Sequence, residues 1–214
     1  MQTLHFNRFR QAILLTAVMA IIILGCSSFI GKNELFLLLN GDLGTIADHF
    51  FPYCTYLGDG IIWVPVVILM FIYRRDTWVM IIASIIISTI ITHIFKDWLM
   101  PYEPRPIKAI TDTSLIHLVP GVEVNTVSSF PSGHTTTAFS IFLLACLLIP
   151  KKWVLPTGFF VAMLVGYSRI YLAQHFPRDV GAGMIAGIIT AIASVYIQQL
   201  VTKRKLKKNK ATLQ

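Results

Sequence analysis

The chain has 214 residues, of which 55% are hydrophobic and only 13% are charged. Soluble domains carry about 25% charged residues, so this composition excludes an ordinary soluble globular protein. The formal net charge is +8, and the position of the basic residues along the chain, more than their number, indicates what they do.

Six apolar segments predict an all-α, polytopic membrane protein, because a membrane-spanning helix needs about 20 apolar residues. The second segment is short as an uninterrupted run, so we expect it to begin nearer Tyr56. No repeat or linker divides the chain, which predicts one membrane domain over residues 1–214. The six predicted spans are 11–29, 61–73, 78–95, 132–149, 153–173 and 180–201.

Lys and Arg are distributed unevenly between the two sides that the alternating spans define. One side carries twelve basic residues against a single acid, Asp76, and the other carries six basic residues against nine acids. Basic residues are retained in the cytoplasm during membrane insertion. Both termini are therefore predicted to be cytoplasmic, which agrees with an even number of six spans.

The last part of the chain, 203–214, is predicted to be a basic cytoplasmic tail that lies on anionic lipid. Binding to nucleic acid is not expected, and no obligate protein partner is evident. The three cysteines show no metal or disulfide spacing. The run I-L-G-C-S-S resembles a lipoprotein cleavage site, but five further spans favour retention of the first span.

Two segments on the predicted outer side are long, while the cytoplasmic connections are short. Residues 30–56 contain two apolar stripes broken by polar residues, which fit either short interfacial helices or an ordinary loop. Residues 97–131 are rich in Pro and Thr. Long ordered loops tend to carry function, so the outer face is where we expect it.

Polar and ionisable residues gather at the predicted outer ends of the spans and in the adjoining loops. Such residues are costly near a bilayer and indicate a functional site by default. Scattered surface charges have no reason to share one depth. The residues concerned are Lys96, Arg105, Ser132, His134, Arg169, His175 and Asp179.

The stretch P-S-G-H, which opens the fourth span, has the features of an anion site. Ser132 is a good helix N-cap, and Gly133 lets an anion approach the backbone. The N–H groups of a first helical turn have no partner within the helix, and the helix dipole adds positive charge there. A capped helix with an incidental histidine at position 134 explains this stretch alone equally well.

The stretch S-R-I-Y-L-A-Q-H-F-P-R-D adds a guanidinium and a His–Asp pair. Arg169 suits bidentate contacts to phosphate oxygens. Pro177 fits the first turn of the sixth span, which places Asp179 within reach of His175. A carboxylate bonded to one ring nitrogen leaves the other as a nucleophile. A pair that only joins two helices is the alternative, and it leaves Arg169 and His134 unexplained.

The three stretches together resemble the type 2 phosphatidic acid phosphatase family, whose catalytic core is shared with vanadium haloperoxidases. Its signatures Pro-Ser-Gly-His and Ser-Arg…His…Asp are complete here, at 131–134 and 168–179. The order of the signatures and the six-span layout also match. The Lys…Arg-Pro signature departs from the pattern, because eight residues separate Lys96 from Arg105 where six are usual. Either the loop bulges and Lys96 still reaches a phosphate, or Lys96 has moved and contributes less. Taken alone, Lys96 fits an interface anchor.

The resemblance implies a two-step phosphoryl transfer without a metal or other cofactor. His175 is expected to attack phosphorus and form a phosphohistidine, oriented by Asp179. His134 is expected to protonate the leaving oxygen and then to deprotonate the attacking water. Fixed cations replace the metal that many phosphatases use. The residues expected to hold the phosphate are Lys96, Arg105, Ser132, Gly133 and Arg169.

Topology and resemblance together imply a lipid phosphatase of the bacterial inner membrane whose site faces the periplasm. The substrate class is a membrane lipid phosphate, and four members of it are compatible: undecaprenyl pyrophosphate, phosphatidylglycerol phosphate, phosphatidic acid and lipid A phosphate. We expect the outer segments 30–56 and 97–131 to decide among them. A lipid phosphotransferase that uses the same phosphohistidine remains open.

An anion or lipid transporter is a second alternative of a different class. Transport sites lie near the bilayer midplane, often in broken helices. Here the ionisable residues gather at one end of the spans, which disfavours transport. A haloperoxidase fits poorly with six membrane spans.

Overall fold

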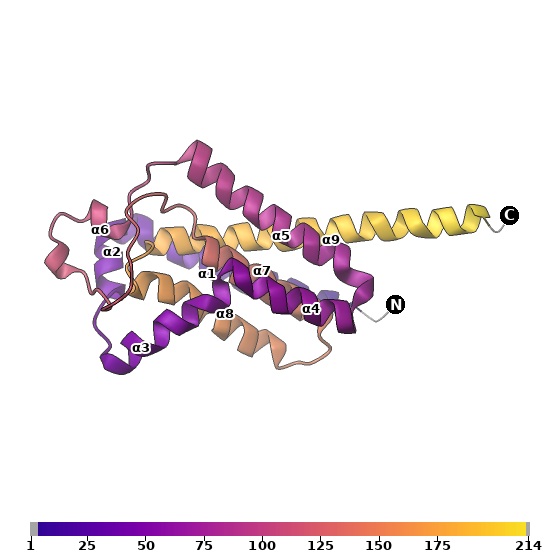
Figure 1. Ribbon diagram of the computed structural model, residues 1–214, viewed down its shortest axis with the longest axis horizontal. Helices are drawn as coiled ribbons and strands as arrows, with labels where there is room; N and C mark the ends of the chain where they lie inside the picture. Colours follow the sequence, from indigo (N-terminus) through magenta and orange to yellow (C-terminus); the bar gives the residue numbers. More distant parts are fainter. Residues whose placement is uncertain (1–3, 213–214) are drawn as a thin grey trace.

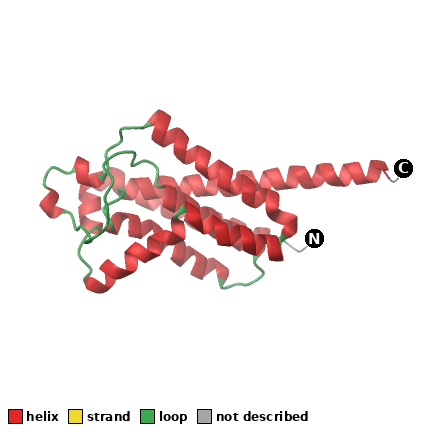
Figure 2. Cartoon of the chain, in the orientation of Figure 1, coloured by secondary structure: helices red, strands yellow, loops and turns green. Residues whose placement is uncertain are grey.

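The computed structural model describes residues 4–212, and this part of the chain is built of helices without a strand (Figures 1 and 2). Short 3₁₀ or π-helical turns lie between some of the α-helices: η1 Thr55–Gly58, η2 Gly60–Ile62, η3 Arg75–Thr77, η4 Ile94–Leu99 and η5 Thr113–Leu115. The α-helices are α1 Phe6–Ile30, α2 Lys32–Leu39, α3 Thr45–Cys54, α4 Trp63–Tyr73, α5 Trp78–His93, α6 Pro106–Ala109, α7 Gly133–Leu148, α8 Val154–Tyr171 and α9 Pro177–Thr212.

Each of the six predicted spans is helical, but not all of the helices are long enough to cross a bilayer alone. Four are long and apolar enough, and α3 with α4 forms a fifth candidate that bends by 58°. Helix α7 has only 16 residues. The structure therefore supports four to five candidate spans, and the count of six remains a prediction. The four are Phe6–Ile30, Arg75–Leu99, Val154–Tyr171 and Pro177–Lys207.

The first outer segment is helical rather than an extended loop, because α2 and α3 occupy most of residues 30–56. Their depth in a bilayer remains a prediction. Figure 1 shows both chain ends at one end of the bundle and α2, α3 and α6 at the other. This arrangement is the one expected of termini on a common side, and the assignment of that side to the cytoplasm remains a prediction.

Helix α9 projects beyond the bundle at the end where the chain terminates (Figure 1). The projecting part includes the basic residues that follow position 203, which were predicted to form a tail. The helix continues to Thr212, and residues 213–214 of the predicted tail lie outside the described residues.

Helix α7 is the central helix of the bundle. It contacts α1, α5, α8, α9 and η1, and twelve of its 16 residues are buried. A helix surrounded in this way needs no polar face. Two of its buried hydroxyl groups donate to carbonyls one turn earlier: Thr136 Oγ1 to Ser132 O at 2.9 Å and Ser140 Oγ to Thr136 O at 2.7 Å. These internal bonds satisfy groups that would otherwise be costly to bury.

Glycines on α9 allow α7 and α9 to approach closely. A Cβ on Gly183 would lie 2.7 Å from Ser132 O, and one on Gly187 would lie 2.9 Å from Phe139 Cβ. Small residues at helix contacts have this role in membrane bundles, where packing drives association. The Ser132 N–H also donates to Asp179 O at 3.0 Å. The first turns of α7 and α9 are thereby fixed against one another.

Arginines hold the opposite end of α7. Buried Arg74 donates from Nη1 to Leu148 O at 2.9 Å, and Arg8 donates to Ile149 O. The last carbonyls of a helix lack internal partners and carry partial negative charge, so cations stabilise them. The central helix is therefore held in position at both of its ends.

Replacing Gly183 by Ala tests the close approach of α9 to α7. The added methyl meets a backbone oxygen that cannot move alone, so we expect a loss of about 1–3 kcal/mol and a lower melting temperature. Gly25→Ala in α1 is the matched control, because nothing lies within 4 Å of its Cβ position. Thermal unfolding in detergent, followed by circular dichroism, measures both. Equal melting temperatures for the two variants would contradict the tight contact.

Candidate active site

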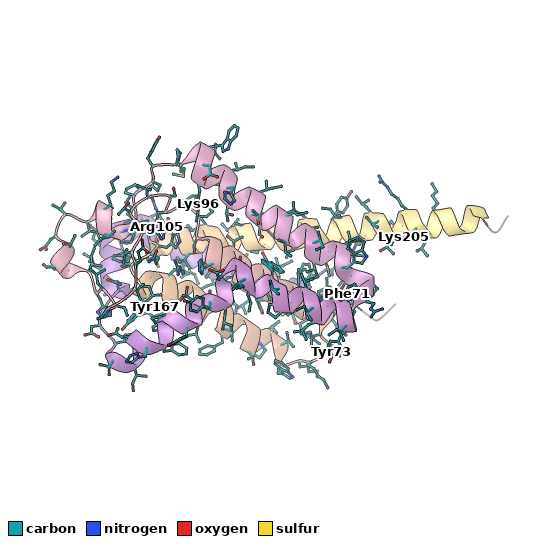
Figure 3. The ribbon with its side chains drawn as sticks, viewed as in Figure 1. Phe71, Tyr73, Lys96, Arg105, Tyr167 and Lys205 are labelled. Carbon is teal, nitrogen blue, oxygen red and sulfur yellow. The ribbon has the colours of Figure 1, made fainter. Side chains whose placement is uncertain are left out.

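Lys96 lies on the π-helical turn η4, Ile94–Leu99, which continues α5. Its Nζ is 3.9 Å from the position that a Cβ on Gly133 would occupy. A π-helical turn is wider than an α-helical one and often occurs at functional sites. Despite the eight residues before Arg105, the structure places Lys96 beside the P-S-G-H turn. Figure 3 shows Lys96 and Arg105 at one end of the bundle, far from Phe71 and Tyr73.

The P-S-G-H turn starts α7 as predicted, with Ser132 as its N-cap. The buried Ser132 Oγ accepts hydrogen bonds from Thr135 Oγ1 at 2.9 Å and from Thr135 N at 3.4 Å. Gly133 and His134 are the first two residues of the helix, where N–H groups have no partner one turn earlier. The serine hydroxyl thus closes the helix start, and the backbone beside it is suited to an anion.

Arg105 is buried, and its guanidinium is held by the surrounding main chain. Nε donates to Val127 O at 2.9 Å, and Nη1 donates to Gln174 O at 3.0 Å and to Gln174 Oε1 at 2.7 Å. Among the described residues, no hydrogen bond uses Nη2. Burial lowers the pKa of Arg105, and the Asp179 carboxylate acts in the opposite direction. The fixed guanidinium keeps one nitrogen available to a phosphate oxygen.

Arg169 lies in the last turn of α8 and is also buried. Nη1 donates to Thr55 Oγ1 of η1 at 2.7 Å. Its carbonyl accepts from the backbone N–H groups of Gln174 and His175. Within residues 4–212, its Nε is a buried donor without a partner. A buried unpaired donor is costly, and an anion at this position would satisfy it.

His175 and Asp179 form the predicted pair across the start of α9, and both are almost completely buried. His175 Nδ1 lies 3.7 Å from Asp179 Oδ2, which is beyond a hydrogen bond. The same carboxylate oxygen accepts from Ser129 Oγ at 2.6 Å and from Phe176 N at 2.9 Å. Asp179 is thus fixed, and a small movement of the imidazole would complete the pair. Catalytic contacts are often this long before substrate binds.

Burial and nearby cations keep His175 neutral. Burial lowers the pKa of His175 well below 6.5, and Arg105, Arg169 and Lys96 lower it further. A neutral imidazole has a lone pair on one ring nitrogen. The three cations that lower this pKa therefore lie within electrostatic reach of the ring.

His134 borders a cavity of about 340 Å³ between α4, α5 and α7. The cavity runs from the P-S-G-H turn to apolar residues of α4 and α5. His134 also lies within electrostatic reach of His175, Arg169 and Lys96. The structure therefore brings the three sequence stretches to one place. The cavity is lined by Gly58, Gly60, Trp63, Ile85, Ser88, Thr89, Thr92, His93, Gly133, His134 and Thr137.

Four residues around this site were not predicted from the sequence. Ser129 donates a hydrogen bond to Asp179, and Gln174 accepts one from Arg105. Each lies near a signature in the sequence, and that nearness is the signal that could have identified them. Thr55 and Asp59 come from the turns before α4, where the sequence carries no signature. Only the packing of these turns against α7 and α8 reveals them.

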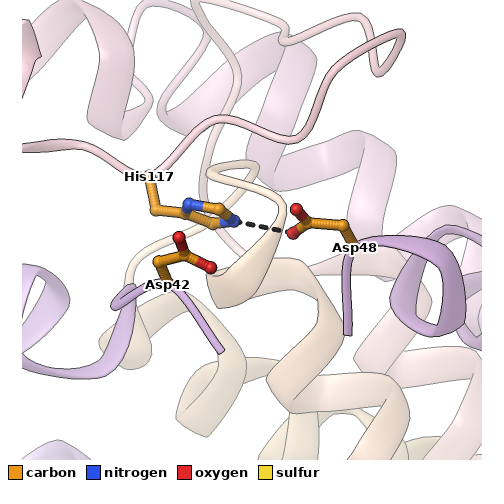
Figure 4. Close-up of side chains that lie close together, drawn as sticks. All are labelled: Asp42, Asp48 and His117. Carbon is orange, nitrogen blue, oxygen red and sulfur yellow. Dashed lines mark hydrogen bonds and ion pairs between the residues drawn. The ribbon is translucent and has the colours of Figure 1, made fainter. Parts of the chain in front are cut away.

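A separate group of Asp42, Asp48 and His117 could hold a metal ion (Figure 4). Their candidate ligand atoms lie within 4.8 Å of one another, and the sequence did not reveal them as a group. The Asp48 carboxylate already has two hydrogen-bond partners without a metal ion. Its Oδ1 lies 2.9 Å from His117 Nε2 and accepts from Tyr171 OH at 2.6 Å. The group shares no residue with the site around His175.

Comparison with known proteins agrees with this geometry. The PAP2 superfamily model matches residues 77–203. An undecaprenyl-diphosphatase of Sulfolobus acidocaldarius is 29% identical over 187 residues, which span 86% of this chain and 87% of that protein. The crystal structure of Aquifex aeolicus LpxE has a TM-score of 0.67 and 34% identity over 76% of this chain and 93% of that one.

A second crystal structure, of a transmembrane PAP2-type phosphatidylglycerolphosphate phosphatase from Bacillus subtilis, shares the fold. It has a TM-score of 0.63 at 22% identity and covers 91% of this chain and 97% of that one. The family model covers more than half of the chain and includes all three signature stretches. The resemblance inferred from the sequence is confirmed: this chain belongs to the PAP2 superfamily of membrane lipid phosphatases.

Proposed function

We propose that this protein removes a phosphate group from a membrane lipid through a phosphohistidine formed on His175. The observation that carries the proposal is the buried imidazole of His175 beside Arg105, Arg169 and Lys96, whose charges lower its pKa. Phosphoryl transfer depends on placement and on neutralisation of charge more than on covalent chemistry. A fixed nucleophile among fixed cations meets both needs.

The first step is attack on phosphorus by Nε2 of His175. Nδ1 faces Asp179, so it carries the ring proton and Nε2 carries the lone pair. As the N–P bond forms, the bond from phosphorus to the leaving oxygen breaks, and His134 gives that oxygen a proton. Positive charge develops on the His175 ring, and the Asp179 carboxylate stabilises it.

The cations hold the phosphate oxygens during this transfer. Arg105 offers Nη2, Arg169 offers Nε and Lys96 offers Nζ, and the first-turn amides of α7 add further donors. Donors that are already in place at a buried site need no reorganisation as charge moves. Removal of one such donor costs about 10²–10³ in rate in other enzymes.

The second step returns His175 to its free state. His134, now neutral, takes a proton from water, and the water oxygen attacks phosphorus as the N–P bond breaks. Inorganic phosphate leaves, and His134 is again protonated for the next substrate. If a lipid or sugar hydroxyl replaced the water, the same intermediate would support a transferase.

The substrate class is a lipid phosphate whose apolar tail lies against the membrane helices. Two features support it: the 340 Å³ cavity joins His134 to apolar side chains of α4 and α5, and the family acts on membrane lipids. Undecaprenyl pyrophosphate, phosphatidylglycerol phosphate, phosphatidic acid and lipid A phosphate remain the candidates. The names of the relatives include the first two of these.

We further propose that the site faces the periplasm from the bacterial inner membrane, with six spans in one domain of residues 1–214. The basic tail supports this orientation, because its Lys205 lies at the opposite end of the structure from Lys96 and Arg105 (Figure 3).

Replacing His175 by Ala tests the phosphohistidine directly. We expect phosphate release from the four candidate lipids to fall more than about 1,000-fold, since nucleophile removal in other enzymes costs at least this much. His49→Ala is the control, because His49 is exposed on α3. Release of inorganic phosphate without an added acceptor distinguishes hydrolysis from transfer. Full activity in the His175 variant would refute the proposal.

The pH dependence of kcat/KM tests the electrostatics of the nucleophile. The pKa of His175 is lowered below 6.5, so its imidazole becomes protonated only at a pH below that of a free histidine. The acidic limb of the profile, where this protonation stops the reaction, should therefore lie below pH 6.5. Arg105→Gln removes one of the lowering charges, so the pKa of His175 rises and the acidic limb moves to higher pH. The exposed Lys108 provides the control variant Lys108→Gln. An unchanged limb in the Arg105 variant would contradict this arrangement.

The absence of a metal requirement is tested by removing metals. Activity is expected to persist in excess chelator, because the three cations near His175 supply the charge that a metal would supply. Vanadate, which adopts the five-coordinate geometry of the transition state, is expected to inhibit. Complete loss of activity in chelator, restored by one divalent cation, would overturn this expectation.

A further inference from the structure

The side chain of Asp59 faces His134 from outside the three signature stretches. Asp59 lies between the 3₁₀ turns η1, Thr55–Gly58, and η2, Gly60–Ile62. Its Oδ1 accepts from Ile61 N at 3.0 Å, and its Oδ2 lies 3.6 Å from His134 Nε2. The bond to Ile61 orients the carboxylate, so its second oxygen is directed towards the imidazole.

Close packing fixes this turn against the start of α7. A Cβ on Gly58 would lie 2.7 Å from His134 O and 3.0 Å from His134 Cβ, so the turn lies directly against the histidine. The other end of η1 is held by Arg169, which donates to Thr55 Oγ1 at 2.7 Å. The turn that carries Asp59 is therefore attached to two residues of the site.

The charges around His134 are otherwise positive or capable of becoming positive. Arg169 faces it from α8, Lys96 from η4 and His175 from the turn before α9. Of the ion pairs between described residues, the one that includes His134 is its pair with Asp59. A general acid must be protonated when the leaving oxygen departs, and neighbouring cations oppose that protonation. The Asp59 carboxylate near Nε2 of the ring favours it.

We propose that Asp59 is the positioning residue of the general acid–base His134: it holds the Nε2 proton and so leaves Nδ1 to exchange protons with the substrate. This inference rests on the proposed function. The family model begins at residue 77, so Asp59 lies outside it.

The proton balance follows from this geometry. In the first step His134 is an imidazolium, and its Nδ1 proton passes to the leaving oxygen as the bond to phosphorus breaks. The neutral ring keeps its Nε2 proton, which Asp59 accepts as a hydrogen bond. In the second step the Nδ1 lone pair takes a proton from the attacking water. The gap of 3.6 Å is longer than a hydrogen bond and is expected to shorten when the ring is charged.

The test compares Asp59→Asn with Asp112→Asn. Asp112 is a matched control, since it also precedes a 3₁₀ turn, η5 Thr113–Leu115, and accepts from the backbone of residue i+2, at 3.1 Å. Both changes remove one carboxylate charge and keep a side-chain oxygen that can accept the hydrogen bond from the backbone N–H of residue i+2. Each full-length variant is assayed in detergent over a range of pH on two phosphate esters, an alkyl lipid phosphate and an aryl phosphate with an acidic phenol.

For Asp59→Asn we expect kcat on the alkyl ester to fall about tenfold and the alkaline limb of the pH profile to move down by about one pH unit, because a one-unit shift corresponds to a tenfold change. The aryl ester should be affected less, since its leaving group needs no proton. Asp59→Glu should recover part of the rate. The Asp112 variant should match the wild type.

Equal losses on both esters without a shift of the alkaline limb would mean that Asp59 only supports the fold of its turn, and the inference would be wrong. The same conclusion follows if Asp59→Asn behaves like the control. In either case His175→Ala would still abolish phosphate release if the proposed function holds. Survival of activity in His175→Ala would instead refute the proposed function itself.

Discussion

The structure depends on the contact between the first turns of α7 and α9. Ser132 N donates to Asp179 O, and Gly183 brings α9 so close that no side chain fits between it and Ser132 O. Through this contact the P-S-G-H turn, which carries His134, and the Asp179 carboxylate, which faces His175, are held in fixed positions relative to one another. Phosphoryl transfer needs placement above all, and a packed pair of helix ends provides it at low entropic cost.

The buried cations impose a second constraint, because like charges in a low-dielectric site repel each other. Arg105 is stabilised by main-chain carbonyls and Gln174, and Arg169 by Thr55 and the turn that follows α8. None of these partners carries a full negative charge. Arg105 Nη2 and Arg169 Nε make no hydrogen bond within residues 4–212, and the proposed function assigns both to phosphate oxygens. Two acids of this region face the histidines: Asp179 faces His175 and Asp59 faces His134.

Much of this site could be predicted because its residues sit in short, chemically explicit stretches. Pro-Ser-Gly-His indicates a helix start, and an Arg followed by His and Asp across a Pro-initiated helix indicates a pair. The position of Lys96 was undecided, because spacing along the chain does not show that a π-helical turn leads back to Gly133. Ser129, Gln174, Thr55 and Asp59 were missed, since contacts between distant segments leave no local pattern.

The sequence by itself determined the helical membrane class and the family and indicated the residues of the candidate site, because hydropathy and motif residues are properties of consecutive positions. Tertiary structure alone decided which groups face one another. It brought Lys96 beside Gly133, gave Arg105 and Arg169 their hydrogen-bond partners, and placed Asp59 beside His134. Those relations arise where η1, α7, α8 and α9 pack together. The physical reason is that close packing brings together side chains whose separation in sequence exceeds any local periodicity.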